Sequence, residues 1–127
     1  MAIGTARVKT SITLIRRQHV LGPFDYDVSY SMDEGARLDY EVSNNTTLQL
    51  IGGVSPQISE ITSVNLLHIT ADQDILVGLE GNDPAVTAWT IYADKMATLG
   101  PGVLITEVAI RNESGSTANV TVIIEGT

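Results

Sequence analysis

The sequence contains no cysteine and few charged residues, and both shortages limit what the protein can be. Without cysteine there is no disulfide framework, thiolate zinc site, iron–sulfur cluster or cysteine nucleophile. Charged residues make up only 17% of the 127 residues, against about 25% in an average globular domain. Because 43% of the residues are hydrophobic, we expect the chain to fold, with part of its surface covered by neighbouring molecules.

Long hydrophobic runs are also missing, since the longest covers little more than Ile75 to Leu79. A membrane-spanning helix needs about 20 apolar residues, and the first nine residues lack the apolar stretch of a signal peptide. We therefore expect no membrane partner, and we expect the chain to be made in a cytoplasm.

Motifs for catalysis or cofactor binding are absent as well. His19 and His68 stand alone rather than at metal-ligand spacing, and there is neither a Gly-x-Ser-x-Gly elbow nor a phosphate-binding glycine loop. The pair Asp39 and Glu41 shares one face of an expected strand, opposite the apolar face, so we expect it to be solvated. The turn at 72–74 has two aspartates but not the spacing of a calcium-binding EF-hand. We predict a protein that is not an enzyme, with no catalytic residue, no metal and no cofactor.

Charge is distributed unevenly along the chain. Residues 1–24 hold four cations and no acid, which gives +4, whereas residues 25–127 hold three cations against fifteen acids, which gives −12. An acidic chain is a poor nucleic-acid binder, because such binding depends on Lys and Arg at the phosphates. The N-terminal segment is either an ordinary exposed basic strand or an arm that lies on the acidic body of a neighbouring subunit.

Apolar and polar residues alternate along most of the chain, which is typical of half-buried strands. We expect breaks at 21–24, 33–36, 43–45, 52–56, 81–84 and 99–102 and a helical turn at 94–97. Between these breaks the pattern predicts strands at 8–14, 26–32, 38–42, 46–51, 64–70, 75–79, 86–92, 103–111 and 120–124.

The fold class expected from these strands is all-β, a single antiparallel β-sandwich of about eight strands, with a jelly roll as first choice. Residues 1–20 are expected to form the basic arm or strand and residues 21–127 the sandwich, and together they are expected to form a single compact domain. The segments 103–105 and 122–124 are apolar on both faces, although a two-layer sandwich buries only one face of each strand. Their second faces are covered either by another chain or by a loop.

The second half of the chain resembles small structural proteins of tailed bacteriophage virions. The resemblance lies in the hairpin at 66–79, the break Leu99-Gly-Pro-Gly102, and the closing hairpin around Asn112-Glu-Ser-Gly-Ser-Thr117, and it covers roughly residues 64–127. It implies a non-enzymatic virion component, assembled in the host cytoplasm. The implied role is that of a head decoration (cement) protein or a part of the neck or tail.

We therefore expect a homo-oligomer, with a trimer favoured, whose partners are copies of itself and the major capsid protein or the neck and portal proteins. A carbohydrate-binding sandwich on a fibre is the competing hypothesis, and exposed aromatic side chains or bound calcium would favour it. The contacts with partners are predicted at two sets of residues, in the basic segment and in two loops: Arg7, Lys9, Arg16, Arg17, Asn82, Asp83, Asn112 and Glu113.

Overall fold

The computed structural model describes residues 4–86 and 88–127, and within them the chain is all-β. Ten antiparallel strands form three sheets, and no helix long and apolar enough to cross a membrane occurs in this part of the chain. The chain divides into two compact units, residues 1–33 and residues 34–127. The all-β class expected from the alternating pattern is confirmed.

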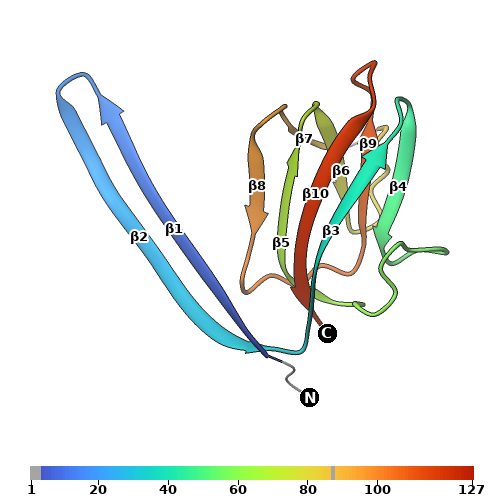
Figure 1. Ribbon diagram of the computed structural model, residues 1–127, viewed down its shortest axis with the longest axis horizontal. Coiled ribbons are helices and arrows are strands. Elements are labelled where there is room, and N and C mark those ends of the chain that lie inside the picture. Colours follow the sequence, from blue (N-terminus) through green and yellow to red (C-terminus); the bar gives the residue numbers. More distant parts are fainter. Residues whose placement is uncertain (1–3, 87) are drawn as a thin grey trace. The chain divides into compact units, whose positions relative to one another are not determined.

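The first unit is one long hairpin, which we call the arm (residues 4–32; Figure 1). Strand β1 (Gly4–Arg16) pairs with β2 (His19–Met32) from Gly4 opposite Met32 to Arg16 opposite His19. Two residues join the strands, and the first of them, Arg17, has a left-handed backbone with φ 55°. A 13-residue strand extends for about 43 Å, so the arm is long compared with its width of two strands.

The second unit is a sandwich of two four-stranded sheets (Figure 1). The first sheet has the order β3 (Glu34–Val42), β10 (Ala118–Gly126), β5 (Val64–Ala71) and β8 (Met96–Leu99). The second has the order β4 (Thr46–Ile51), β9 (Val108–Asn112), β6 (Ile75–Leu79) and β7 (Trp89–Ile91). The strands β8 and β7 are therefore edge strands of their sheets.

Strand pairing in the sandwich is nested, since β3 pairs with β10, β4 with β9, β5 with β8, and β6 with β7. In sequence, each pair encloses the next pair, as in one long hairpin. Successive pairs alternate between the two sheets, so that β3–β10 and β5–β8 lie in one sheet and β4–β9 and β6–β7 in the other. A jelly roll is an eight-stranded, two-sheet design of Greek keys, and it remains our interpretation of this topology.

The core lies between the two sheets and is built from the inward positions of alternating strands. Along β10, Val120, Val122 and Ile124 are buried, whereas Ile123 between them is exposed. Leu104 is also exposed, so no loop covers the outward face at either position. The fully buried large side chains all belong to the second unit: Val42, Leu50, Ile51, Val64, Leu67, Ile69, Ile75, Val108, Ile110, Val120, Val122 and Ile124.

The expected break at 21–24 is wrong, because β2 continues through Gly22 and Pro23. Between Ile12 and Leu14 the register shifts, so that one residue on β1, Thr13, opposes two on β2, Gly22 and Pro23. The glycine and proline form a bulge rather than a turn, and a two-stranded ribbon accommodates proline because each strand has a free edge. As a result, the first unit extends to residue 33 rather than to residue 20.

Further expectations about elements are wrong. Most of the break expected at 33–36 falls within β3, which begins at Glu34, and the strand expected at 86–92 is shortened to β7 (Trp89–Ile91). The helical turn at 94–97 is replaced by the start of β8, which Met96 enters as a partner of Thr70. The long strand at 103–111 is shortened to β9, because residues 103–107 leave the sheet and attach elsewhere. Ile105 forms an isolated bridge with Val64 on the other sheet, and the carboxylate of Glu80 accepts the backbone N–H groups of Thr106 and Glu107.

Candidate functional site

The arm has one apolar face, and its opposite face is polar except for the pair Ile15–Val20 near the tip. Paired residues of an antiparallel ribbon point to the same side, and the pairs Val8–Val28, Ile12–Phe24 and Leu14–Leu21 are all apolar. We call this side the apolar face of the arm (Val8, Ile12, Leu14, Leu21, Phe24, Tyr26 and Val28). Its five large residues between Ile12 and Tyr26 are 49% to 60% exposed, so the apolar face is largely uncovered.

The bulge at Gly22 keeps the apolar face continuous toward the tip of the arm. Without the extra residue, Leu14 would face Gly22; with it, Leu14 faces Leu21. Gly22 has φ +102°, and a Cβ at this position would lie 2.7 Å from the carbonyl oxygen of Ile12. Only glycine fits such a backbone without strain.

The polar face of the arm contains Arg7 and Lys9, two of the cations predicted to contact partners. Arg7 donates two hydrogen bonds to the carboxylate of Asp27, at 3.0 Å from Nε and 2.8 Å from Nη2. The guanidinium lowers the pKa of Asp27, and the carboxylate raises the pKa of Arg7. Lys9 is exposed on the same face, opposite Asp27, and Arg17 is exposed at the tip. The side chain of Arg16 lies outside the described residues.

The loop after β6 is fixed by its own side chains. Asn82 donates from Nδ2 to the carbonyl oxygen of Leu79 at 2.8 Å, and Asp83 accepts the backbone N–H of Ala85 at 2.9 Å. Both residues are exposed, so the predicted contact at this loop stays a prediction.

The loop after β9 has a buried anchor. Asn112 is fully buried; its Nδ2 donates to the carbonyl oxygens of Val42 at 2.8 Å and Ser116 at 2.6 Å, and its Oδ1 accepts the N–H of Ser114. The side chain of Asn112 therefore stabilises the loop through these hydrogen bonds. Glu113 accepts a hydrogen bond from Nε of Arg111 at 2.7 Å. Of the two residues predicted to contact partners at this loop, it is the one that is exposed.

An apolar groove opens at one edge of the sandwich, between β7 of one sheet and β8 of the other. We call it the edge groove, and its volume is about 150 Å³. It lies next to the core, and Trp89 on its rim is 59% exposed. Nearly all of its lining is apolar: Leu67, Ile69, Val77, Trp89, Thr90, Ile91, Ala97 and Leu99.

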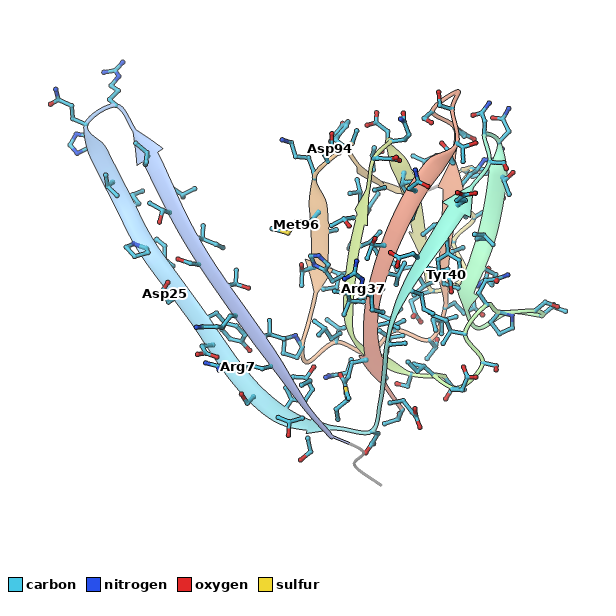
Figure 2. The ribbon with its side chains drawn as sticks, in the orientation of Figure 1. Arg7, Asp25, Arg37, Tyr40, Asp94 and Met96 are labelled. Carbon is cyan, nitrogen blue, oxygen red and sulfur yellow. The ribbon has the colours of Figure 1, made fainter. Side chains whose placement is uncertain are left out.

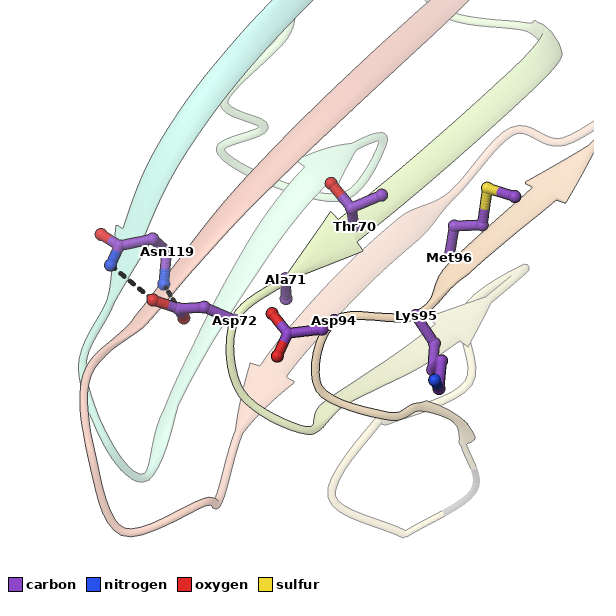
Figure 3. A pocket seen from close by; sticks show the side chains of 7 residues that line it. All are labelled: Thr70, Ala71, Asp72, Asp94, Lys95, Met96 and Asn119. Carbon is purple, nitrogen blue, oxygen red and sulfur yellow. Dashed lines mark hydrogen bonds between the residues drawn. The ribbon is translucent and has the colours of Figure 1, made fainter.

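A larger, more open hollow of about 630 Å³ lies where β5 ends and β8 begins (Figure 3). Asp72 in this hollow accepts hydrogen bonds from the backbone and side-chain nitrogens of Asn119 at 2.7 and 2.8 Å, which lower the pKa of its carboxyl. Its neighbour Asp74 accepts the N–H of Ala93 at 2.8 Å. Both carboxylates hold the ends of strands together.

Metal ligation finds no support in the described residues, where no group of three or more His, Asp and Glu side chains gathers. His68 lies on β5, and its Nδ1 is 2.7 Å from the hydroxyl of Thr98 on the neighbouring strand. As expected, Asp39 and Glu41 lie on the exposed side of β3, where Asp39 accepts a hydrogen bond from Thr121 at 2.7 Å.

The surfaces with a capacity to bind are therefore the apolar face of the arm and the edge groove. The sequence predicts a basic arm or strand that ends at residue 20, with partner contacts only at its cations. The apolar face is not predicted, because Gly22 and Pro23 indicate a break that separates Leu21 and Phe24 from the strand. The groove was missed because its walls come from four strands. The available signal was Trp89, a large aromatic residue in a short strand.

Comparisons with known proteins do not identify the chain. No family model matches it, and neither the curated proteins nor the solved structures give a significant match. The resemblance of residues 64–127 to phage structural proteins therefore stays a prediction.

Proposed function

We propose that this chain is a non-enzymatic structural protein that assembles with copies of itself through the arm. The observation that carries the proposal is the exposure of the apolar face, where Ile12, Leu14 and Phe24 are each more than half exposed. A two-stranded ribbon on its own is marginally stable in water, and a contiguous exposed apolar strip is typical of an interaction surface. A covering partner both removes this strip from water and holds the ribbon in one conformation.

The more specific proposal follows the resemblance of residues 64–127. We propose a decoration protein on the head shell of a tailed phage, a homo-oligomer with a trimer favoured, which bridges neighbouring copies of the major capsid protein. Contacts that exist only in the assembled lattice stabilise that lattice by mass action, and several weak contacts per oligomer add up. A neck or tail adaptor, with neck or portal proteins as partners, is the alternative location.

The native mass of the purified chain tests the first proposal, and a low-resolution map of the particle that carries it tests the second. We expect an oligomer in solution and regular density on the shell, or a ring at one vertex for the neck alternative. A chain that stays monomeric at tens of micromolar contradicts self-assembly, and particles without density for it contradict the virion role.

A carbohydrate-binding module is a second candidate, and one observation favours it. Trp89 and Tyr92 at the β7 edge are 59% and 64% exposed, and exposed aromatic rings are the usual platform for sugar rings. Glycan-array binding by the isolated chain that is lost in Trp89→Ala would support this candidate. Absence of glycan binding would remove it.

A further inference from the structure

The edge groove has the size and chemistry of a pocket for one aromatic side chain. Its volume is about 150 Å³ and its lining is apolar except for Thr90. Apolar protein cavities of about this volume take up benzene. Phe24 is the only phenylalanine of the chain, and it lies near the middle of the apolar face of the arm, opposite Ile12, with 60% of its surface exposed.

Unpaired strand edges border both the edge groove and the apolar face of the arm. In the described part of the chain β8 pairs only with β5, and β7 only with β6, so each has an unpaired outer edge at the groove. The arm has only two strands and so offers two free edges of its own. An added ribbon is a recurrent way to satisfy such edges, with backbone hydrogen bonds for affinity and side-chain pockets for specificity.

Charge favours one orientation of the arm in the groove. Arg17 at the tip lies five positions after Ile12, and Asp94 at the loop end of β8 lies five positions before Leu99 in the groove; each stretch spans about 17 Å when extended. With β1 antiparallel to β8, a ring of Phe24 at the level of Leu99 therefore brings Arg17 to the level of Asp94. Figure 2 labels Asp94 at the end of the sandwich from which β8 starts.

The net charges of the two units also favour contact between an arm and a sandwich. Residues 1–33 hold four cations and three acids, a net charge of +1, whereas residues 34–127 hold three cations and twelve acids, a net charge of −9. Copies of the sandwich repel one another, and the basic tip of an arm is attracted to the sandwich.

We infer that the arm of one copy binds in the edge groove of a second copy, with Phe24 seated between β7 and β8. The occupant is a second copy because the acidic sandwich and the apolar, basic-tipped arm are complementary surfaces that every copy carries. The contact is heterologous, arm to groove, and such a contact forms a ring, such as the proposed trimer, when the rotation between successive copies closes. This inference rests on the proposed self-assembly and names its contact surface.

The test compares the native masses of the full chain and of two variants, Phe24→Asp on the arm and Trp89→Glu on the groove. Both side chains are more than half exposed, so both variants are expected to fold. The matched controls are Ile15→Asp, on the opposite face of the arm and 73% exposed, and Leu104→Asp, on the sandwich outside the groove and 75% exposed. We expect each groove or arm variant to be monomeric and each control to assemble like the original chain.

Mixing the two monomeric variants gives the sharpest result. The arm of Trp89→Glu is intact and so is the groove of Phe24→Asp, so the mixture is expected to form a complex of two chains with one good contact. Trp89 is the only tryptophan, and its emission in the original chain is expected to shift to shorter wavelength as assembly covers it.

The outcomes separate this inference from the proposed function. An oligomeric original chain whose two variants also assemble overturns the groove contact and leaves self-assembly standing. A monomeric original chain overturns both. A monomeric chain whose Trp89 emission changes in Phe24→Asp shows an arm bound to its own sandwich, which also overturns the contact between copies.

Discussion

At the scale of single residues, the polar side chains of the sandwich act mainly as braces. Asn112, Glu80 and Asp72 each accept or donate hydrogen bonds that tie a loop to a strand end. These are residue types that sequence reasoning considers first as ligands or contacts. Their position in the fold instead commits them to holding the sandwich in shape.

Replacing Asn112 by alanine is expected to destabilise the sandwich by about 2–3 kcal/mol. The side chain is fully buried, and its loss leaves the carbonyl oxygens of Val42 and Ser116 without this donor and the N–H of Ser114 without this acceptor. Urea denaturation measures the change in the free energy of unfolding. The control Glu113→Gln removes only a surface ion pair with Arg111, worth under about 1 kcal/mol; equal losses in both variants would contradict the bracing role.

Glu80 makes the stability of the sandwich depend on pH. Its carboxylate accepts hydrogen bonds from the backbone N–H groups of Thr106 and Glu107 and, at 3.0 Å, from the hydroxyl of Thr106, and these bonds lower the pKa of Glu80. A carboxyl whose pKa is lower in the folded state stabilises the fold above its unfolded pKa, about 4.3 for Glu. That contribution is lost as the pH falls through the folded value.

We expect Glu80→Gln to be less stable than the original chain at pH 7 and to lose less stability between pH 5 and pH 3. Urea denaturation at several pH values measures both quantities. Glu60→Gln, which changes another exposed carboxylate of the sandwich, is the matched control. Curves for Glu80→Gln that run parallel to those of the original chain would show that the bonds to Thr106 and Glu107 contribute nothing.

At the scale of elements, the arm and the sandwich differ in what stabilises them. The large fully buried side chains lie between Val42 and Ile124, all in the sandwich, whereas the arm has none among its described residues. The sandwich therefore holds its own core, and the arm depends on backbone pairing and on whatever covers its apolar face.

Deletion of residues 1–33 is expected to leave the sandwich folded. The core of residues 34–127 is complete without the arm, and the boundary falls between Asp33 and Glu34 at the start of β3. Circular dichroism and urea denaturation of residues 34–127 measure this. A cooperative transition close to that of the full chain is expected, and loss of cooperativity would show that the arm is needed for the fold.

The bulge in the arm is expected to be needed for assembly. Gly22→Ala places a Cβ against the carbonyl oxygen of Ile12 at a positive φ, so the register that brings Leu21 opposite Leu14 is strained. We expect the apparent dissociation constant of the oligomer to rise about tenfold, the effect of a loss of about 1.4 kcal/mol. Sedimentation velocity over a range of concentrations measures this.

Gly4→Ala is the matched control on the same strand pair, because its Cβ would make only an ordinary contact, 3.5 Å from the side chain of Met32. Equal assembly of the Gly22→Ala variant and the original chain would show that the bulge is dispensable.

The elements that could be predicted from sequence are strands that bury one face and expose the other, because this produces alternating apolar and polar residues. The strands β4, β5 and β6 begin and end within a residue of their expected positions, because one face of each packs on the core. The failures have tertiary causes. Residues 103–107 are rich in the β-branched residues typical of a strand but attach to Glu80 and Val64, and Gly22 with Pro23 forms a bulge instead of a turn. The edge groove could not be predicted, since it exists only once β7 and β8 lie at the same edge.

At the scale of the whole molecule, the proposed self-assembly depends on exposed apolar surface. The chain has few charged residues, and its exposed large hydrophobic side chains lie on the arm, on and beside β7 and β8 (Val86, Trp89, Tyr92 and Met96), and at Val54, Leu104 and Ile123. A basic tip and an acidic sandwich with a net charge of −9 in the same chain favour contact between unlike parts of different copies over contact between like parts.

Hydrogen exchange of the arm's backbone amides, followed at low and high protein concentration, tests most directly whether the apolar face is covered by another copy. Amides of an isolated ribbon exchange rapidly, whereas those in a packed sheet are protected. If another copy covers the arm, the backbone amides at 8–14 and 20–28 become strongly protected from exchange as the protein concentration rises. The protection of the amides of β5 and β10 is expected to stay the same. Arm amides that exchange rapidly at every concentration would contradict coverage of the apolar face by another copy.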